Sequence, residues 1–225
     1  MSLAVRAVSE LIGTAMLVAA VVGSGIMAES LTSDSGLALL LNQVSTVLGL
    51  GVLIAVLLPV SGAHLNPVVT LGSLLRGDMT GKEMLSYVAA QASGALGGVG
   101  LAHLMFGRYA LEVSSDERLT PGTFVGEVVA TAGLVSVIVV AVHRGQTALL
   151  PLIVPAWIGA AYIFTSSTSF ANPAVTLGRM FTESFSGIAP LSGLGFMAAQ
   201  LVGMALALLV VTPIVSPSKG KNYDR

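Results

Sequence analysis

Six long runs of mostly apolar residues alternate with short polar segments along this chain. A helix needs roughly 20 such residues, at about 1.5 Å each, to cross about 30 Å of hydrocarbon. The runs cover Leu11 to Ala28, Leu37 to Val60, Met84 to Phe106, Phe124 to Val142, Leu149 to Phe164 and Leu191 to Ile214. We therefore predict six membrane-spanning helices. The fifth contains Pro151 and Pro155, which a membrane helix tolerates where neighbouring groups satisfy the freed backbone.

Two further apolar segments, Pro67 to Leu75 and Pro173 to Met180, are too short to span a bilayer. They are either surface loops or half-helices. Each begins with the dipeptide Asn-Pro. Asparagine is a good helix cap and proline suits the first helical turn. This pattern favours two half-helices that enter the membrane without crossing it.

The composition supports a membrane protein and excludes several other classes. Of 225 residues, 54% are hydrophobic and only 9% are charged, and a soluble domain carries roughly 25% charged residues. A disordered chain would be more polar, and a nucleic-acid binder more basic. A disulfide scaffold needs cysteines, and this chain has none. We expect one all-α polytopic domain over residues 1–225 that sits in the lipid bilayer and binds no nucleic acid.

The loop charges predict an orientation. With six spans, both termini lie on one side of the membrane. Cationic residues on that side are Arg6, Arg76, Lys82, Arg144, Lys219, Lys221 and Arg225, and those on the other side are Arg108, Arg118 and Arg179. Because cytoplasmic loops carry the excess of Lys and Arg, both termini are predicted to be cytoplasmic, in a multi-pass protein of the cytoplasmic membrane.

The chain also repeats itself. From Asn66 to Gly72 and from Asn172 to Gly178, six of seven residues are identical. Similar segments around Glu10 and Glu127 precede the two copies, and an Ala-Ala-Gln triplet follows each one. Repeat one covers about residues 6–106 and repeat two about residues 123–214. Because each repeat holds three spans, the second inserts upside down relative to the first.

Inverted repeats bring the two half-helices together near the middle of the membrane. Their N-termini place two partial positive charges there, which repel cations, including hydronium. Asn66 and Asn172 offer amide donors to a solute oxygen at this point. The backbone carbonyls of residues 62–65 and 167–171 have no helix partners, so they line a wet pore or are buried in protein. The pattern favours a passive pore for small, polar, uncharged molecules.

The paired Asn-Pro boxes, the segment 61–68 and the repeated glutamates resemble the aquaporin (major intrinsic protein) family over roughly residues 6–213. The box residues beside the asparagines are Pro67, Val68, Pro173 and Ala174. The resemblance implies six spans and two half-helices around a pore, usually in a homotetramer with one pore per subunit. It also implies downhill flux of water and small solutes, with no cofactor and no enzymatic step.

Two positions depart from the family pattern. The first box has Val68 where alanine is usual, and Val175 stands where an arginine usually follows the second box. By spacing, the other constriction residues are Thr46, Ala160 and Ser169, although a gap between residues 157 and 172 would displace Ala160. A selectivity filter without arginine, aromatic residue or histidine is expected to be wide. Glycerol-like, urea-like and metalloid (arsenite) solutes are then candidates beside water.

The ionisable residues near the pore have alternative interpretations. Glu10 and Glu127 either couple protons in a secondary transporter or, as the resemblance implies, hold the two pore loops. His64 is either a pH-sensitive pore residue or a brace for its loop. Arg179, one turn beyond Val175, either stays at the outer surface near Glu183, which is the favoured interpretation, or turns towards the pore mouth and partly replaces the missing charge. The chain shows no spacing typical of a metal site and no catalytic cluster, so we expect neither a metal nor an enzyme.

Overall fold

The computed structural model describes residues 1–108 and 111–215, and its long elements there are helices. Six of them are long and apolar enough to cross a membrane, α6 together with the short turn η1 (Thr147–Leu149) before it. Their bounds are α1 (Leu3–Leu31), α2 (Ser35–Ser61), α4 (Gly81–Met105), α5 (Pro121–His143), α6 (Leu150–Phe164) and α8 (Pro190–Val215). The prediction of six spans is confirmed, and each span extends a few residues beyond its apolar run or matches it closely.

The two short apolar segments form the half-helices α3 (Pro67–Leu75) and α7 (Pro173–Arg179). Each begins as its dipeptide predicts. The Asn66 side chain accepts a hydrogen bond from Val68 N at 3.0 Å, and Asn172 accepts one from Ala174 N at 2.9 Å. In both cases the proline occupies the first helical turn, where a backbone N–H has no helical partner.

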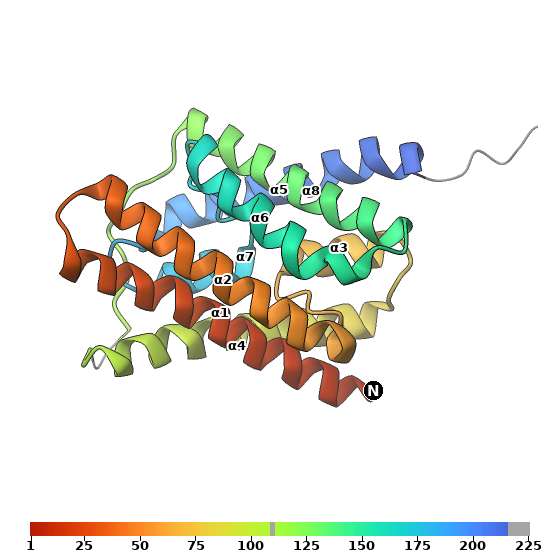
Figure 1. Ribbon diagram of the computed structural model, residues 1–225, viewed down its shortest axis with the longest axis horizontal. Coiled ribbons are helices and arrows are strands. Elements are labelled where there is room, and N and C mark those ends of the chain that lie inside the picture. Colours follow the sequence, from red (N-terminus) through yellow and green to blue (C-terminus); the bar gives the residue numbers. More distant parts are fainter. Residues whose placement is uncertain (109–110, 216–225) are drawn as a thin grey trace, which may run out of the picture.

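The helices form two groups of the same design. In Figure 1, α1, α2 and α4 lie along one side of the molecule and α5, α6 and α8 along the other, with α3 and α7 between them. Within each group the first helix packs against the other two, and α2 and α6 join the groups. The start of α1 and the end of α8 lie at the same end of the molecule, as an even number of spans requires (Figure 1). The all-α architecture with two half-helices is confirmed.

Two glycines at equivalent places allow close helix crossings. A Cβ atom on Gly94 of α4 would overlap the carbonyl oxygen of Leu11 in α1. A Cβ atom on Gly203 of α8 would lie 2.5 Å from the carbonyl oxygen of Val128 in α5. Because backbone atoms meet at both crossings, no larger side chain fits without moving a helix.

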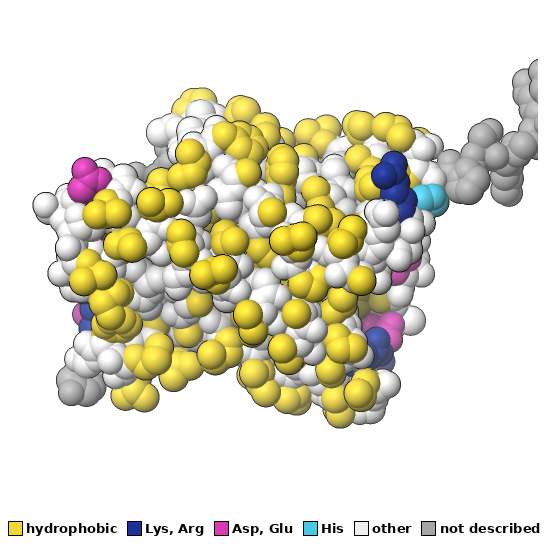
Figure 2. All heavy atoms as spheres, in the orientation of Figure 1, with side chains coloured by type: hydrophobic (Ala, Val, Ile, Leu, Met, Phe, Trp, Pro, Cys, Tyr) yellow, Lys and Arg dark blue, Asp and Glu magenta, His cyan; other side chains and the backbone are white. Residues whose placement is uncertain are grey.

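The outer surface has the character of a protein that faces lipid. Large apolar side chains are exposed along the spans, among them Leu48, Leu104 and Leu209, which are 66%, 68% and 72% exposed. Figure 2 shows apolar side chains across the middle of one face and charged side chains towards its two ends. An apolar surface of this extent is stable in a bilayer and would aggregate in water.

Candidate functional site: a pore between the two halves

A cavity of about 440 Å³ runs between the two groups of helices. Asn66 and Asn172 line it at the centre. We call the end on the side of the start of α1 the inner mouth, where Arg76, Asp78 and Thr147 line the cavity. We call the opposite end the outer mouth. The walls between are mostly apolar, with lining residues that include Leu17, Val21, Leu50, Ile54, Leu58, Leu134, Ile138, Leu150, Val154 and Ile158.

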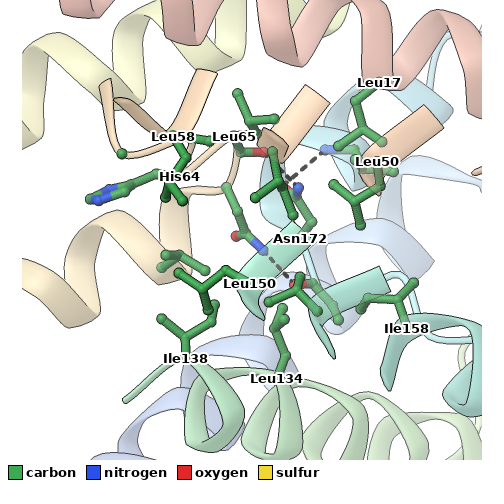
Figure 3. Close-up of a pocket in the computed structure, with 18 of the residues that line it drawn as sticks. Leu17, Leu50, Leu58, His64, Leu65, Leu134, Ile138, Leu150, Ile158 and Asn172 are labelled. Atoms are coloured by element: carbon green, nitrogen blue, oxygen red, sulfur yellow. Dashed lines mark hydrogen bonds between the residues drawn. The ribbon is translucent and has the colours of Figure 1, made fainter. Parts of the chain in front are cut away.

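The two asparagines are joined to the opposite pore loops. The Asn66 side-chain amide donates to the carbonyl of Ala171 at 2.8 Å, and the Asn172 amide donates to the carbonyl of Leu65 at 2.8 Å. Figure 3 shows both bonds as dashed lines, surrounded by apolar side chains. Since an amide NH₂ has two hydrogens, each asparagine keeps one for the cavity. Sequence reasoning placed the amides at the centre but missed that each also ties the two halves together.

The pore loops leading to the asparagines have an unusual backbone. Five residues other than glycine adopt left-handed φ angles, namely Ala63, Leu65, Thr168, Ser169 and Ala171, at 48°, 48°, 61°, 52° and 47°. All of them except Thr168 also line the cavity. The carbonyls of residues 63, 64, 169 and 170 accept no hydrogen bond from the described part of the chain. They are acceptors available to a solute.

Glu10 holds the first pore loop. Its carboxylate accepts hydrogen bonds from His64 N at 3.0 Å and Leu65 N at 2.6 Å. It also accepts from the Ser61 hydroxyl at 2.7 Å and the Gln91 amide at 2.8 Å. The side chain is fully buried. The four donors surround the carboxylate, so its contacts are those of a brace for the loop.

Glu127 holds the second pore loop in the same way. It accepts from Phe170 N at 2.8 Å and Ala171 N at 2.9 Å, from the Ser167 hydroxyl at 2.8 Å and from the Gln200 amide at 2.7 Å. It is fully buried as well. Neither glutamate lines the cavity, so neither is reached by a solute within it.

The predicted constriction is partly wrong. Thr46, Ser169 and Val175 line the cavity, but Ala160 lies on the exposed face of α6. Tyr162, two residues further along α6, lines the cavity instead, and its hydroxyl lies 3.5 Å from the hydroxyl of Thr46. The predicted one-to-one spacing therefore fails between residues 157 and 172. An aromatic side chain borders the cavity at this level, contrary to the expectation of a filter without one.

For Arg179 the favoured position at the outer surface is wrong, and the structure has the alternative position at the pore. Its side chain is only 3% exposed and lines the cavity near the outer mouth, away from the protein surface. A residue four positions after Val175 lies on the same face of a helix, so the spacing itself contains the signal. The sequence offered the pore mouth only as the less favoured position of Arg179, because the loop that folds over it gives no pattern of its own.

His64 has both of the features that its two interpretations require. It lines the cavity near the inner mouth. Its Nδ1 atom lies 3.1 Å from the Thr70 hydroxyl, and its ring packs edge-on against Tyr87 at 5.3 Å between ring centroids. The contacts brace the loop while one part of the ring faces the pore. Within the described residues, no group of His, Cys, Asp and Glu side chains is arranged to hold a metal ion.

Comparison with known proteins identifies a family and relatives that share this sequence pattern. Residues 1–171 match the major intrinsic protein family. The chain is 47% identical over 214 residues to the aquaglyceroporin AqpS of Rhizobium meliloti (strain 1021), which covers 95% of this chain and 91% of that protein. It is 27% identical over 221 residues to the glycerol uptake facilitator protein of Pseudomonas aeruginosa, covering 84% and 78% of the two chains.

The fold is similar to that of a solved structure, the aquaglyceroporin from Plasmodium falciparum. The TM-score is 0.67 at 23% sequence identity, over 95% of this chain and 99% of the other. This similarity concerns the fold, and the family match and the relative from Rhizobium meliloti concern the sequence itself. The chain therefore belongs to the major intrinsic protein family.

Proposed function

We propose that this chain is a passive membrane channel for water and small uncharged solutes. One observation carries the proposal. Amide donors of Asn66 and Asn172, with loop carbonyls that accept no hydrogen bond from the described residues, face a cavity whose walls are mostly apolar. A water molecule or a hydroxyl group exchanges its hydrogen bonds in water for bonds to these fixed groups. An ion finds no comparable replacement for its hydration shell.

The centre of the pore disfavours cations and protons. The N-termini of α3 and α7 meet there, and each contributes a partial positive charge of about half a unit. Each asparagine amide is fixed by its bond to the opposite loop, so it donates to a passing water and does not accept from it. A chain of waters whose central oxygens only accept from the protein conducts protons poorly. These two effects support the exclusion of ions and protons.

The alternative of a coupled secondary transporter fits the geometry less well. Such a protein needs a titratable group that the substrate or the coupling ion reaches. Glu10 and Glu127 are fully buried behind the pore loops and bind four donors each. Among the described residues that line the cavity, Asp78 is the only carboxylate, and it lies at the inner mouth. A passive channel needs no catalytic group, and we propose no enzymatic step.

The solute class follows from the constriction and from the relatives. Val175 leaves the space where an arginine would stand, and Tyr162 borders the same level. An opening with small side chains on two sides and an aromatic ring on another suits a slim molecule with hydroxyl groups along one edge. Relatives of this chain are named aquaglyceroporin and glycerol uptake facilitator. We therefore propose glycerol-like polyols first, with urea and uncharged metalloid acids such as arsenite as further candidates.

We also propose the setting in which the channel works. It is a homotetramer in the cytoplasmic membrane, with both termini in the cytoplasm and residues 1–225 forming one domain of two inverted repeats. The common end of α1 and α8 supports the orientation, together with Arg6, Arg76 and Arg144 on that side. Of the other cations counted for the orientation, Lys219, Lys221 and Arg225 lie outside the described residues, and Arg179 faces the pore and no longer counts.

Light scattering on vesicles tests the function. Purified protein in lipid vesicles is mixed with water-drawing gradients of sucrose, glycerol, urea or arsenite, and the volume change is followed. We expect fast water and glycerol flux with a low activation energy and no dependence on a proton gradient. Flux that needs a proton or sodium gradient, or vesicles no more permeable than protein-free ones, would contradict the proposal.

A further inference from the structure

Arg179 is the last residue of α7 and lies one helical turn beyond Val175. Its side chain is buried to 97% of its surface, and yet it lines the cavity. An arginine almost never occupies so buried a position without a counter-charge, because removing a cation from water is costly. What fixes this side chain, and what it faces, therefore bears on what the pore accepts.

Two contacts fix the guanidinium group. Its Nε atom donates to the carbonyl of Ser186, in the loop that follows α7. Its Cζ atom lies 3.4 Å from the centre of the Phe170 ring, a cation–π contact. Phe170 in turn packs edge-on against Phe196 of α8, with 5.0 Å between ring centroids. The ring that carries the guanidinium is therefore itself held in place.

The loop after α7 also returns over the arginine. The N–H of Ile188 donates to the carbonyl of Arg179 at 3.1 Å. Ser186 and Ile188 are buried, so this segment packs closely over the arginine. The side chain cannot leave for the surface without breaking the Ser186 bond and the Phe170 contact, so it is fixed towards the cavity.

The two terminal nitrogens of the guanidinium have no partner among the residues that the structure describes. Within the described residues, Nη1 and Nη2 of Arg179 make no hydrogen bond, and no carboxylate lies within 4.0 Å of them. They are also absent from the buried nitrogen atoms that lack both solvent and a partner. The nearby carboxylate of Asp116 pairs with Arg118 instead. A whole positive charge with free donors thus faces the cavity.

We propose that Arg179, and not residue 175, supplies the fixed cation of the outer pore, and that its terminal N–H groups bind hydroxyl oxygens of an uncharged solute. The inference rests on the proposed channel function and deepens it. A cation one turn, about 5.4 Å, further out leaves the level of Val175 open to a polyol carbon. It still repels cations before they reach the asparagines, and it offers paired donors to two neighbouring hydroxyls.

Four proteins in lipid vesicles test this proposal: the wild type, Arg179→Met, Arg179→Lys and, as a matched control, Arg108→Met. Methionine keeps the unbranched apolar stem and removes the charge and the donors. Lysine keeps the charge and loses the planar fork. Arg108 lies outside the cavity and donates to the carbonyl of Glu183, so its loss removes a cation from the same side of the protein. Water and glycerol flux are measured by light scattering, and potassium and proton leaks by dyes.

We expect Arg179→Met to conduct water, to lower the ratio of glycerol to water flux roughly tenfold, the effect of one charge-assisted hydrogen bond, and to raise the cation leak. Arg179→Lys should keep cations out but lose most of the glycerol preference, and Arg108→Met should match the wild type. Should Arg179→Met fail to fold, the lysine variant and its flux ratio carry the test. Unchanged ratios and leaks in both variants would overturn the proposal. A wild type without solute flux would instead overturn the proposed channel function.

Discussion

The two halves of this molecule are alike at the centre of the pore and different at its mouths. At the centre, Glu10 and Glu127 each accept from one serine hydroxyl, two backbone N–H groups and one glutamine amide, and each asparagine donates to the opposite loop. At the mouths, His64 corresponds to Phe170 and Ser73 to Arg179. The repeated residues are those that fix the backbone, and the residues that differ are those that a solute meets first.

The two mouths of the pore also differ in charge. At the inner mouth, Arg76 forms an ion pair with Asp78, so the local net charge is close to zero. At the outer mouth, Arg179 faces the cavity, and no carboxylate of the described residues lies within 4.0 Å of its side-chain nitrogens. A symmetric scaffold therefore carries an asymmetric electrostatic profile. Exclusion of cations is expected to begin on the outer side.

The largest expected effect concerns the shared scaffold. Replacing Glu10 or Glu127 by alanine leaves four donors without their acceptor inside the protein. At about 1–3 kcal/mol for each unsatisfied group, the loss exceeds about 4 kcal/mol, and we expect both variants to fail to assemble. The measurement is the yield of monodisperse protein in detergent and its thermal midpoint. Glu29→Ala, at an exposed site, is the matched control.

Equal damage from the two glutamate variants is the outcome that the symmetric scaffold requires. If one variant were as stable as the control while the other were lost, the two halves would not be equivalent at the centre. The comparison between them would then fail at its starting point.

The next effect concerns the helix crossings. Alanine at Gly94 or at Gly203 would press a methyl group against a backbone carbonyl, at a cost of about 1–3 kcal/mol. Gly97→Ala places its methyl where, beyond its own helix backbone, no atom of the described residues lies within 4 Å, and it should be neutral or slightly stabilising. Thermal unfolding in detergent ranks the three variants. A Gly97 variant as unstable as the other two would show that close packing is not the cause.

A smaller effect, which differs between the two halves, is expected from adding an arginine to the pore. Val175→Arg puts a second cation one turn from Arg179 in the outer constriction, so we expect glycerol flux to fall roughly tenfold and water flux less. Val69→Arg, the equivalent change in the first half, adds its charge on the side where Asp78 lies, and its effect should be weaker. Light scattering with both solutes measures the difference. Equal losses in both variants would argue against an asymmetric pore.

The smallest effect concerns the outer loop. The carboxylate of Glu183 accepts from Ser115 N and from the Ser115 hydroxyl, both at 2.8 Å. The bond from the backbone, followed by that from the hydroxyl, lowers the pKa of Glu183 below its ordinary value of 4.5. Because the pKa is lowered, the ionised Glu183 stabilises the folded loop at pH values above the ordinary carboxyl pKa. This stabilisation is lost as the pH falls through the pKa of the folded state.

Hydrogen exchange at the Ser115 amide measures how the stability of this loop changes with pH. The protection factor should hold at pH values down to about the ordinary carboxyl pKa and then decrease. Glu183→Gln should reduce protection at neutral pH without changing water flux, because Glu183 is exposed and lies outside the cavity. Protection in that variant equal to the wild type would mean that the carboxylate does not hold the loop.

The repeat is what made most of this fold predictable. Apolar length located the spans and the Asn-Pro dipeptides located the half-helices, both from local chemistry. Comparing the chain with itself found the duplicated glutamates, and of their two interpretations the role as braces came from the family resemblance. Symmetry then places the two asparagines together, because two copies of one motif in inverted halves meet at a common axis.

The errors lie where the halves differ. Ala160 was placed by counting back from Asn172, and the segment between α6 and the second box does not follow that count, so Tyr162 faces the pore instead. For Arg179 the sequence favours the outer surface and leaves the pore mouth as the alternative. Only the fold of the following loop, through Ser186 and Ile188, shows that it is enclosed. Features without a repeated partner depend on long-range packing, so spacing alone does not decide between such alternatives.

The crossed bonds of the asparagines have a consequence for how the protein is made. The amide of Asn66 donates to a carbonyl 105 residues later in the chain, and the carbonyl of Leu65 accepts from an amide 107 residues later. During synthesis, the first half therefore enters the membrane with its pore loop unfinished. It becomes a complete structure only when the second half arrives. A chain that ended before Ala171 would leave the Asn66 amide and the Leu65 carbonyl without these partners.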